Sequence, residues 1–265
     1  MTHNQKIIIR GGGDIATGVA QKFHRAGFAV IILETAAPTA IRRTVALSEA
    51  AYDGTKQVED IICQKIDNLS QIEACIKAKT IPLLIDPTAE SISKINPTAV
   101  IDAILAKRNI GTNKNMAPIT IALGPGFTAG KDVQIVIETQ RGHDLGRLIF
   151  NGEAQPNTGI PAEIEGKGSI RVLRAPADGL VKAQKQIGEI VQKDEIIFTV
   201  ENHPVKASFK GLLRGLLRDG TKVTKGTKTA DIDPRLHIDV TTISDKARTL
   251  GGAALEAYLY LQKGD

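Results

Sequence analysis

Apolar and polar positions alternate along the first part of the chain in a pattern that predicts a strand, a helix and a second strand. A strand pattern over residues 6–10, with Ile7, Ile8 and Ile9 at its centre, leads into three glycines, and apolar residues at helical spacing follow from Ile15 to Ala26. Gly27 ends this helical pattern, and a second apolar run over residues 28–33 ends at Glu34. The stretch therefore predicts a βαβ unit.

The alternation of strand and helix patterns continues to residue 138. We expect helical segments at 39–51, 69–79 and 91–95, and strands at 58–66, 81–85, 99–101, 119–123 and 133–138. Strands and helices that alternate at this spacing favour a parallel sheet with helices on both faces. The predicted fold class is α/β, with a doubly wound, Rossmann-like parallel sheet.

Beyond residue 170 the pattern changes to short strands and turns, and it repeats after 32 residues without a gap. Four positions show the repeat, with Ala175, Gly179, Gly188 and Val191 recurring as Ala207, Gly211, Gly220 and Val223. One repeat cannot bury its own apolar face, so two are expected to interlock as a small β sandwich. A helix capped by Ser244, with one apolar stripe, follows.

These patterns predict three parts of the chain. Residues 1–165 are expected to form a Rossmann-like ligand-binding domain, and residues 170–235 the all-β domain with the internal repeat. Residues 236–265 are expected to form a C-terminal helix that packs back on the first domain, because its apolar stripe must be covered.

The first glycine turn has the pattern G-x-G-x-x-A. Gly11 would permit the tight turn, Gly13 would let the backbone approach a phosphate, and the small Ala16 would let helix and strand pack closely. A phosphate would bind the free N–H groups at the start of the helix, and Glu34 could accept hydrogen bonds from ribose hydroxyls. A glycine turn that merely joins strand to helix is the structural alternative.

Arg10 departs from the usual dinucleotide-binding pattern, because it occupies a strand end where a small apolar residue is common. Two roles are open for it: pairing with an anionic ligand, or bonding to a nearby carboxylate. Asp86 and Asp102 are such carboxylates at predicted strand ends, where the alternative role is to cap the following helix.

A second glycine-rich turn, 124–130, follows the apolar strand 119–123. It could cradle an anion together with the first turn, or be a rigid turn without a ligand. The candidate cofactor-binding residues are Arg10, Gly11, Gly12, Gly13, Asp14, Glu34, Lys107, Arg108, Gly124 and Gly126. No catalytic residue is assigned, and the roles of Arg141, His143 and Arg147 stay open.

Composition narrows the range of partners. The 34 Lys and Arg residues exceed the 29 Asp and Glu residues, which suits a small anionic ligand or an acidic partner surface. Nine aromatic residues supply no stacking platform for nucleic acid. No apolar run has the length of a membrane span and no signal-peptide pattern is present, so we expect a cytoplasmic protein without a membrane partner. Cys63 and Cys75 are expected to be core thiols, and no metal site is predicted.

The repeat segment resembles the barrel-sandwich hybrid of biotinyl and lipoyl carrier domains, where residues 175–179 are similar to their A-P-x-x-G segment. Carriers present a modifiable lysine at the hairpin between the two halves, whereas this chain has Glu201, Asn202, His203 and Pro204 there. Lys206 lies too near the next strand to serve obviously. We therefore expect no biotin or lipoyl group, and a docking or scaffold role for this domain.

Six stretches together resemble one family, the accessory (maturation) proteins of the selenium-dependent molybdenum hydroxylase system. They are residues 9–18, 40–44, 103–109, 123–130, 141–147 and 243–248. The family is distantly similar to the accessory factors of xanthine dehydrogenase. The resemblance implies a role in maturation of a hydroxylase, a molybdopterin-type cofactor as ligand, and a molybdenum hydroxylase or selenium-delivery protein as partner.

Two other functions stay open at this point. The βαβ unit and Glu34 favour an NAD-dependent oxidoreductase, in which the ligand would be a dinucleotide. A non-catalytic scaffold, with purely structural glycine turns, is the third interpretation. Whether the protein is an enzyme is not decided by the sequence.

Overall fold

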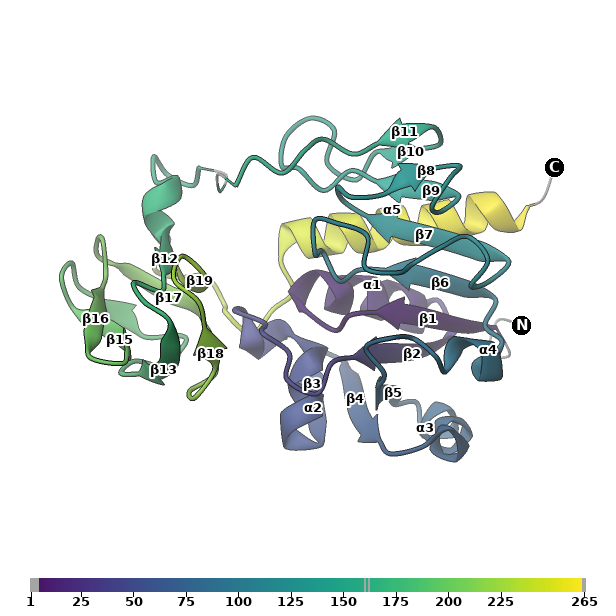
Figure 1. Ribbon diagram of the computed structural model, residues 1–265, viewed down its shortest axis with the longest axis horizontal. Coiled ribbons are helices and arrows are strands. Elements are labelled where there is room, and N and C mark those ends of the chain that lie inside the picture. The colour runs from purple at the N-terminus through teal and green to yellow at the C-terminus, as the bar shows by residue number, and fades with distance from the viewer. Residues whose placement is uncertain (1–4, 160, 162, 264–265) are drawn as a thin grey trace. The chain divides into compact units, whose positions relative to one another are not determined.

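The computed structural model describes residues 5–159, 161 and 163–263 and is of mixed α/β type (Figure 1). The chain forms two compact units. The α/β unit consists of Met1–Pro38, Ala46–Asn157 and Ile243–Asp265, and the β unit consists of Thr39–Val45 and Thr158–Thr242. None of the described helices is long and apolar enough to cross a membrane.

The α/β unit contains a nine-stranded sheet with the order β10-β9-β7-β6-β1-β2-β5-β4-β3. Its strands, in chain order, are β1 (Lys6–Arg10), β2 (Ala29–Glu34), β3 (Thr55–Val58), β4 (Ile61–Ile66), β5 (Ile81–Ile85), β6 (Ala99–Asp102), β7 (Ile119–Leu123), β9 (Ile135–Ile137) and β10 (Leu148–Ile149). A small antiparallel pair joins β8 (Thr128–Ala129) to β11 (Gly152–Glu153).

The central strands are parallel, whereas both edge strands are antiparallel to their neighbours. β3 pairs with β4 and β10 pairs with β9 in antiparallel register. The prediction of one strand over 58–66 was wrong, because Glu59 and Asp60 form a two-residue connection between β3 and β4. So short a connection permits only an antiparallel pair, and the sheet is therefore mixed.

Helices lie on both faces of this sheet. Their bounds are α1 (Asp14–Arg25), α2 (Ala50–Asp53), α3 (Ile72–Lys77), α4 (Ile92–Ile95) and α5 (Asp245–Gln262), with 3-10 turns η1 (Arg43–Val45), η2 (Leu47–Glu49), η3 (Leu69–Gln71) and η4 (Ser169–Arg171). Apolar side chains of α3 and α4 form one core cluster with Ile8, Ile31 and Val100 from the strands.

The predicted helix over 39–51 is not formed, and only short turns occupy this stretch. Its backbone groups bond to other segments: Ile41 O accepts from Leu216 N within the β unit, and Ser48 N donates to Gly12 O within the α/β unit. A continuous helix would need both groups for its own i→i−4 ladder. The stretch instead carries the chain into the β unit and back again.

Helix α5 packs along α1 through small residues. A Cβ added at Gly18 would collide with the backbone of Ala247, and one added at Gly251 would collide with the backbone of Gly18. Further along, Tyr258 packs edge-on against Phe23 and Phe28, with ring centroids 5.6 and 5.0 Å away. The early turns of the two helices thus lie together, as do their later turns, so the helices run in the same direction.

The β unit consists of two four-stranded antiparallel sheets, β12-β19-β17-β14 and β16-β15-β13-β18. The strands are β12 (Val172–Arg174), β13 (Gly179–Ala183), β14 (Ile190–Val191), β15 (Ile196–Val200), β16 (His203–Lys206), β17 (Gly211–Leu216), β18 (Lys222–Val223) and β19 (Lys228–Asp233). Fifteen buried residues, among them Val181, Phe198, Leu213 and Ile232, form its core.

The 32-residue repeat of the sequence is also a repeat of structure. Strands β13, β14 and β15 begin 32 residues before β17, β18 and β19. The connecting hydrogen bonds recur as well: Gly188 N donates to Leu213 O, and Gly220 N donates to Val181 O. Each half therefore bonds to the other through the same positions, which is the arrangement of two interlocked copies.

The contact between α1 and α5 gives a stability prediction with a built-in control. Gly251→Ala should lower the free energy of unfolding by about 1–3 kcal/mol, because its methyl group meets the Gly18 backbone. Gly252→Ala, whose Cβ meets nothing within 4 Å, should be neutral or stabilising by up to about 1 kcal/mol through helix propensity. Urea denaturation of both variants is the measurement, and equal stability of the two would contradict the prediction.

Candidate functional site

The carboxyl ends of the parallel strands bring most of the predicted site residues to one edge of the sheet. Arg10 ends β1, Glu34 ends β2, Asp102 ends β6, and Gly124 follows β7. Cα pairing places Arg10 opposite both Leu33 and Asp102. In open α/β sheets this edge is where ligands bind.

Arg10 takes the second of the two roles considered for it, because it bonds to protein groups. Its side chain is 2% exposed, and its guanidinium lies 3.8 Å from Asp102 Oδ2 and 3.3 Å from Pro87 O. It also donates to Thr112 Oγ1, which in turn donates to Asp102 Oδ2 at 2.5 Å. Burial raises the pKa of Asp102, while bonds from Thr112 and the Ile104 amide and the Arg10 charge oppose that rise.

Four of the five candidate glycines are required by the protein's own packing. A Cβ on Gly11 would lie 3.0 Å from Ile104 Cα, and one on Gly12 would lie 2.9 Å from Ser48 N. A Cβ on Gly124 would lie 2.7 Å from Thr139 Oγ1, and one on Gly126 would lie 2.5 Å from Arg108 Cα. These glycines let loops approach one another whether or not a ligand is bound.

Gly13 is the exception among the five. A Cβ at this position would meet no atom within 4 Å, so the residue faces open space. Gly13 also precedes the first residue of α1, and no side chain caps that helix start among the described residues. Against Gly12, the hydroxyl of the buried Ser48 has no hydrogen-bond partner in the described part of the chain. The start of α1 thus has no side-chain cap, and the space at Gly13 in front of it is open, as an anion site at a helix start requires.

Glu34 lies against the same turn, but its carboxylate is already engaged. Oε2 accepts from Gly12 N at 2.8 Å and Oε1 accepts from Thr35 N at 2.7 Å. Burial raises the pKa of Glu34, which these two backbone bonds only partly offset. A ribose hydroxyl would therefore have to share oxygens that already accept backbone hydrogen bonds.

Lys107 and Arg108 are exposed and belong to the loop that follows β6. The backbone of Arg108 packs on Gly126, so this loop and the second glycine turn are in contact. Asp86 accepts from the amides of Glu90 and Ser91, close to the start of α4. Asp102, by contrast, caps no helix.

Lys246 is a residue of this edge that the sequence analysis did not select. It lies in the first turn of α5, whose start is beside that of α1. Burial and the charge of Arg141 lower the pKa of Lys246, while the carboxylates of Asp14, Glu138 and Asp245 act in the opposite direction. A half-buried lysine among charged groups at a strand edge is a common feature of functional sites. Gly251, which makes the close contact with α1, was a sequence signal for the position of this helix but not for the role of Lys246.

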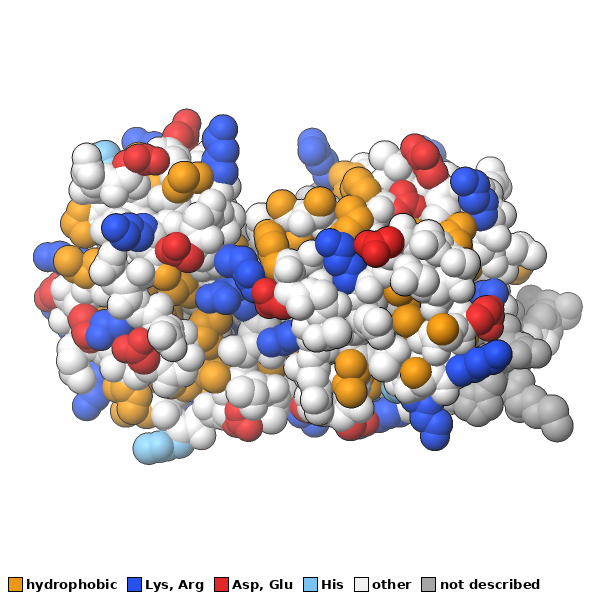
Figure 2. All heavy atoms as spheres, turned by 90° about the horizontal axis from the view of Figure 1, so that it is seen from below, with side chains coloured by type: hydrophobic (Ala, Val, Ile, Leu, Met, Phe, Trp, Pro, Cys, Tyr) orange, Lys and Arg blue, Asp and Glu red, His pale blue; other side chains and the backbone are white. Residues whose placement is uncertain are grey.

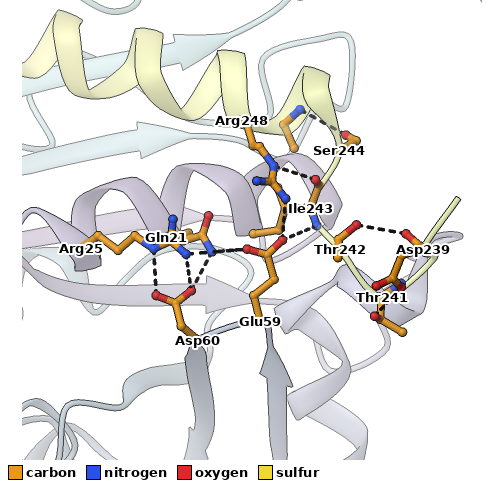
Figure 3. A network of polar contacts seen from close by, with 11 residues as sticks. Gln21, Arg25, Glu59, Asp60, Asp239, Thr241, Thr242, Ile243, Ser244 and Arg248 are labelled. Atoms are coloured by element: carbon orange, nitrogen blue, oxygen red, sulfur yellow. Dashed lines mark hydrogen bonds and ion pairs between the residues drawn. The ribbon is translucent and has the colours of Figure 1, made fainter.

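A polar network fixes the start of α5 (Figure 3). Glu59 Oε1 accepts from Ile243 N and from Arg248, both at 2.8 Å, and Glu59 Oε2 accepts from Gln21 of α1. Asp60 accepts two hydrogen bonds from Arg25. The Glu59 contacts hold Ile243 and Arg248, which lie on either side of Lys246 in the sequence.

The Arg-Gly-His stretch lies at the surface. Arg141 forms two hydrogen bonds of 2.7 Å with Asp245, and His143 lines an open hollow with Asp144 and Arg147. A neighbouring hollow of about 460 Å³ is lined by Glu138, Arg147, Phe150 and six further residues. Both Glu138 oxygens accept backbone bonds, from Gln140 and Gln155.

The described residues contain no group of three or more side chains that could hold a metal ion. Cys63 and Cys75 are both buried and unbridged. Burial raises the pKa of Cys63 well above its usual range, so this thiol is not a reactive nucleophile.

Comparison with known proteins gives one relative at substantial identity. The chain is 47% identical over 259 residues to the uncharacterized protein YqeB of Escherichia coli (strain K12), a match that covers 97% of this chain and 48% of that protein. The chain thus spans about half the length of this relative. No protein-family model matches the chain.

Two solved structures are distantly similar. One is the apo form of the ectoine utilization protein EutE (DoeB) from Ruegeria pomeroyi, with 9% identity, coverage of 87% and 86% of the two chains, and a TM-score of 0.25. The other is an aspartoacylase family protein from Mesorhizobium loti, with 12% identity, coverage of 87% and 84%, and a TM-score of 0.27. TM-scores this low establish neither a shared fold nor a shared activity.

The buried Arg10–Asp102 pair gives a prediction about stability. Arg10→Met should cost about 3–5 kcal/mol, because it leaves the Asp102 carboxylate buried without its cation. The double variant Arg10→Met/Asp102→Leu should recover most of that loss. Arg141→Met, which breaks an exposed ion pair, is the control and should cost under about 1 kcal/mol. Chemical denaturation measures all three, and an Arg10→Met cost no larger than the control would contradict a structural role for Arg10.

The Asp60 contacts give a pH prediction. Hydrogen bonds from Arg25 lower the pKa of Asp60 from 3.8 to about 2. Because the folded-state pKa is the lower one, the Asp60 contribution to stability is complete above about pH 4 and is lost as the pH falls toward 2. The side chain is 49% exposed, so the contribution should stay under about 1 kcal/mol. Unfolding free energies of wild type and Asp60→Asn should converge on acidification, whereas a difference that persists at pH 2 would contradict this.

Proposed function

We propose that this protein is an accessory factor in the maturation of a selenium-dependent molybdenum hydroxylase. In this role the α/β unit binds a molybdopterin-type or nucleotide-like anionic ligand at the start of α1. The biological part of the proposal rests on the six resembling stretches. The ligand part rests on the geometry of the sheet edge.

The ligand proposal depends on one observation, the open space beside Gly13. Of the five candidate glycines, it alone has open space where a Cβ would stand, and it precedes an uncapped helix start. Backbone N–H groups and the helix dipole both favour an anion there. Lys246 is the cation we assign to the ligand, in place of Arg10, whose guanidinium is bonded to Thr112 and to Pro87 O.

Within this proposal the α/β unit is a Rossmann-like domain. The parallel strands β5, β2, β1, β6 and β7, in that spatial order, with the glycine turn after the central β1, support this interpretation. The β unit is then a barrel-sandwich hybrid, which the two interlocked halves support. Its hairpin at Glu201 and Asn202 joins β15 to β16 and contains no lysine. The absence of a biotin or lipoyl group stays a prediction, which intact mass measures.

NAD-dependent hydride transfer is the alternative that Glu34 suggested. Both Glu34 oxygens already accept hydrogen bonds from backbone amides. This argues against the contact with a ribose hydroxyl that such a residue makes in dehydrogenases. We propose that any NAD binding is not linked to turnover.

The test is titration of molybdopterin, its nucleotide forms and NAD against wild type and Gly13→Asp. The substitution places a carboxylate in open space, so the fold should persist while like-charge repulsion weakens binding by at least about tenfold. Gly168→Asp, which also meets nothing within 4 Å, adds the same charge in the β unit and should bind as wild type does.

Three outcomes separate the candidate functions. Binding of a pterin form that Gly13→Asp loses supports the proposal. Substrate-dependent NAD reduction at about 1 per second or faster would favour the oxidoreductase. No binding of any ligand to wild type would favour the scaffold, in which all the glycine turns are structural.

A further inference from the structure

The net charge of the chain lies in the β unit. Residues 39–45 and 158–242 contain 16 Lys and Arg and 11 Asp and Glu, a net charge of +5, whereas the α/β unit contains 18 of each and is neutral. On the face that Figure 2 shows, basic, acidic and hydrophobic side chains lie next to one another on the β unit. An uneven charge of this kind is typical of a surface that meets an acidic partner.

One sheet of the β unit presents an outer face that combines lysines with large aliphatic side chains. Cross-strand pairing puts Leu180 beside Lys222, and Ile196 beside Lys206. Lys182, two residues after Leu180, lies on the same face. Leu180 and Ile196 are 53% and 40% exposed. We call this surface, formed by Leu180, Lys182, Ile196, Lys206 and Lys222, the basic face.

The basic face has no charge partner of its own. Among the described residues, none of its three lysines forms an ion pair, whereas nearby Lys185 pairs with Glu189 and Glu195. No carboxylate is paired across the strands with a residue of this face. Two acidic residues of adjoining turns bond to the backbone of β13: Glu201 Oε1 accepts from Leu180 N at 3.1 Å, and Asp219 Oδ1 accepts from Ala183 N at 2.7 Å.

The internal repeat supplies a comparison with the opposite sheet. Shifted by 32 residues, Leu180 and Lys182 correspond to Leu212 and Arg214 on β17. Leu212 is only 4% exposed, and Arg214 bonds to Asp233. The same pairing of a leucine with a basic residue is therefore buried and neutralised in one half of the repeat.

Of the two carboxylates near Arg214, only one has a carboxylate at the corresponding position of the first half. Asp231 corresponds to Thr199, and Asp233 corresponds to Glu201, whose carboxylate bonds to backbone. The lysines of the basic face thus lack the kind of carboxylate partner that Arg214 has in Asp233, because Glu201 bonds to backbone. A carboxylate-bearing apolar surface would supply that partner.

We propose that the basic face is a docking surface for a protein partner with an acidic, partly apolar surface. A second copy of this chain fits poorly, because the β unit would meet its own charge of the same sign. Nucleic acid fits poorly as well, since the face has no aromatic side chain on which bases could stack. Identification of that partner as the hydroxylase rests on the function proposed above.

The first experiment measures binding of the full chain to the purified apo-hydroxylase. Lys182→Glu/Lys206→Glu/Lys222→Glu and Leu180→Ser/Ile196→Ser should each weaken binding by at least about tenfold. The control Lys131→Glu/Lys193→Glu/Lys210→Glu changes the charge equally at exposed lysines outside the face, and should stay within about threefold of wild type. Equal loss in face and control variants would overturn the proposal.

The second experiment does not depend on the identity of the partner. Amide chemical shifts of the full chain are followed during titration with a short oligoglutamate peptide. Shifts concentrated in β13, β15, β16 and β18 support the basic face, and shifts spread over all lysine-bearing segments overturn it. Tighter binding of single-stranded oligonucleotide, or of vesicles containing phosphatidylserine, would also overturn it.

The two experiments separate the two proposals. If the hydroxylase does not bind wild type but oligoglutamate maps to the basic face, the docking surface stands and the assigned partner is wrong. If neither probe reaches the face, the docking surface is wrong, whatever the titration of ligands at Gly13 gives.

Discussion

The backbone contact between α1 and α5 is the constraint on which the candidate site depends. Gly18 and Gly251 let two helices distant in sequence approach closely, and Ala247 completes the contact. Because the helices run in the same direction, their starts lie at the same edge of the sheet. That arrangement brings Lys246 to the edge where Gly13 opens, and the Glu59 network secures it there. A larger residue at either glycine would separate two elements of the site as well as lower stability.

The sequence predicted the strands and helices at this edge of the sheet better than the roles of the residues on them. The β1–α1–β2 stretch and the later parallel strands follow from local patterns of buried side chains, and the 32-residue repeat follows from residues that recur at a fixed distance. The prediction of a helix over 39–51 was wrong because backbone groups of this segment form hydrogen bonds with residues far away in sequence, such as Gly12 and Leu216. No local pattern encodes that choice.

The roles of several candidate residues also depend on contacts with residues distant in sequence. A glycine turn indicates that something approaches the backbone closely, but not whether it is a ligand or another loop. At Gly11, Gly12, Gly124 and Gly126 the structure shows a loop, and only Gly13 is left open. Arg10 was chosen for its charge, although its partners Thr112 and Asp102 lie about a hundred residues further along the chain. Lys246 was missed because its significance comes from the helix contact, not from its neighbours in sequence.

The β unit illustrates how a repeat can acquire two different surfaces. Both halves keep the same interlocking hydrogen bonds, although equivalent core positions can differ, as Phe198 and Ala230 do. The outer faces of the two sheets also differ: Asp231 and Asp233 of one half correspond to Thr199 and Glu201 of the other, and Glu201 accepts a hydrogen bond from the Leu180 backbone. Desolvation makes an unpaired buried cation costly, so Arg214 can be buried only where Asp233 accompanies it. Lys182, without such a carboxylate, stays in solvent until a partner supplies one. The same physical rule therefore accounts for the closed half of the repeat and for the open half.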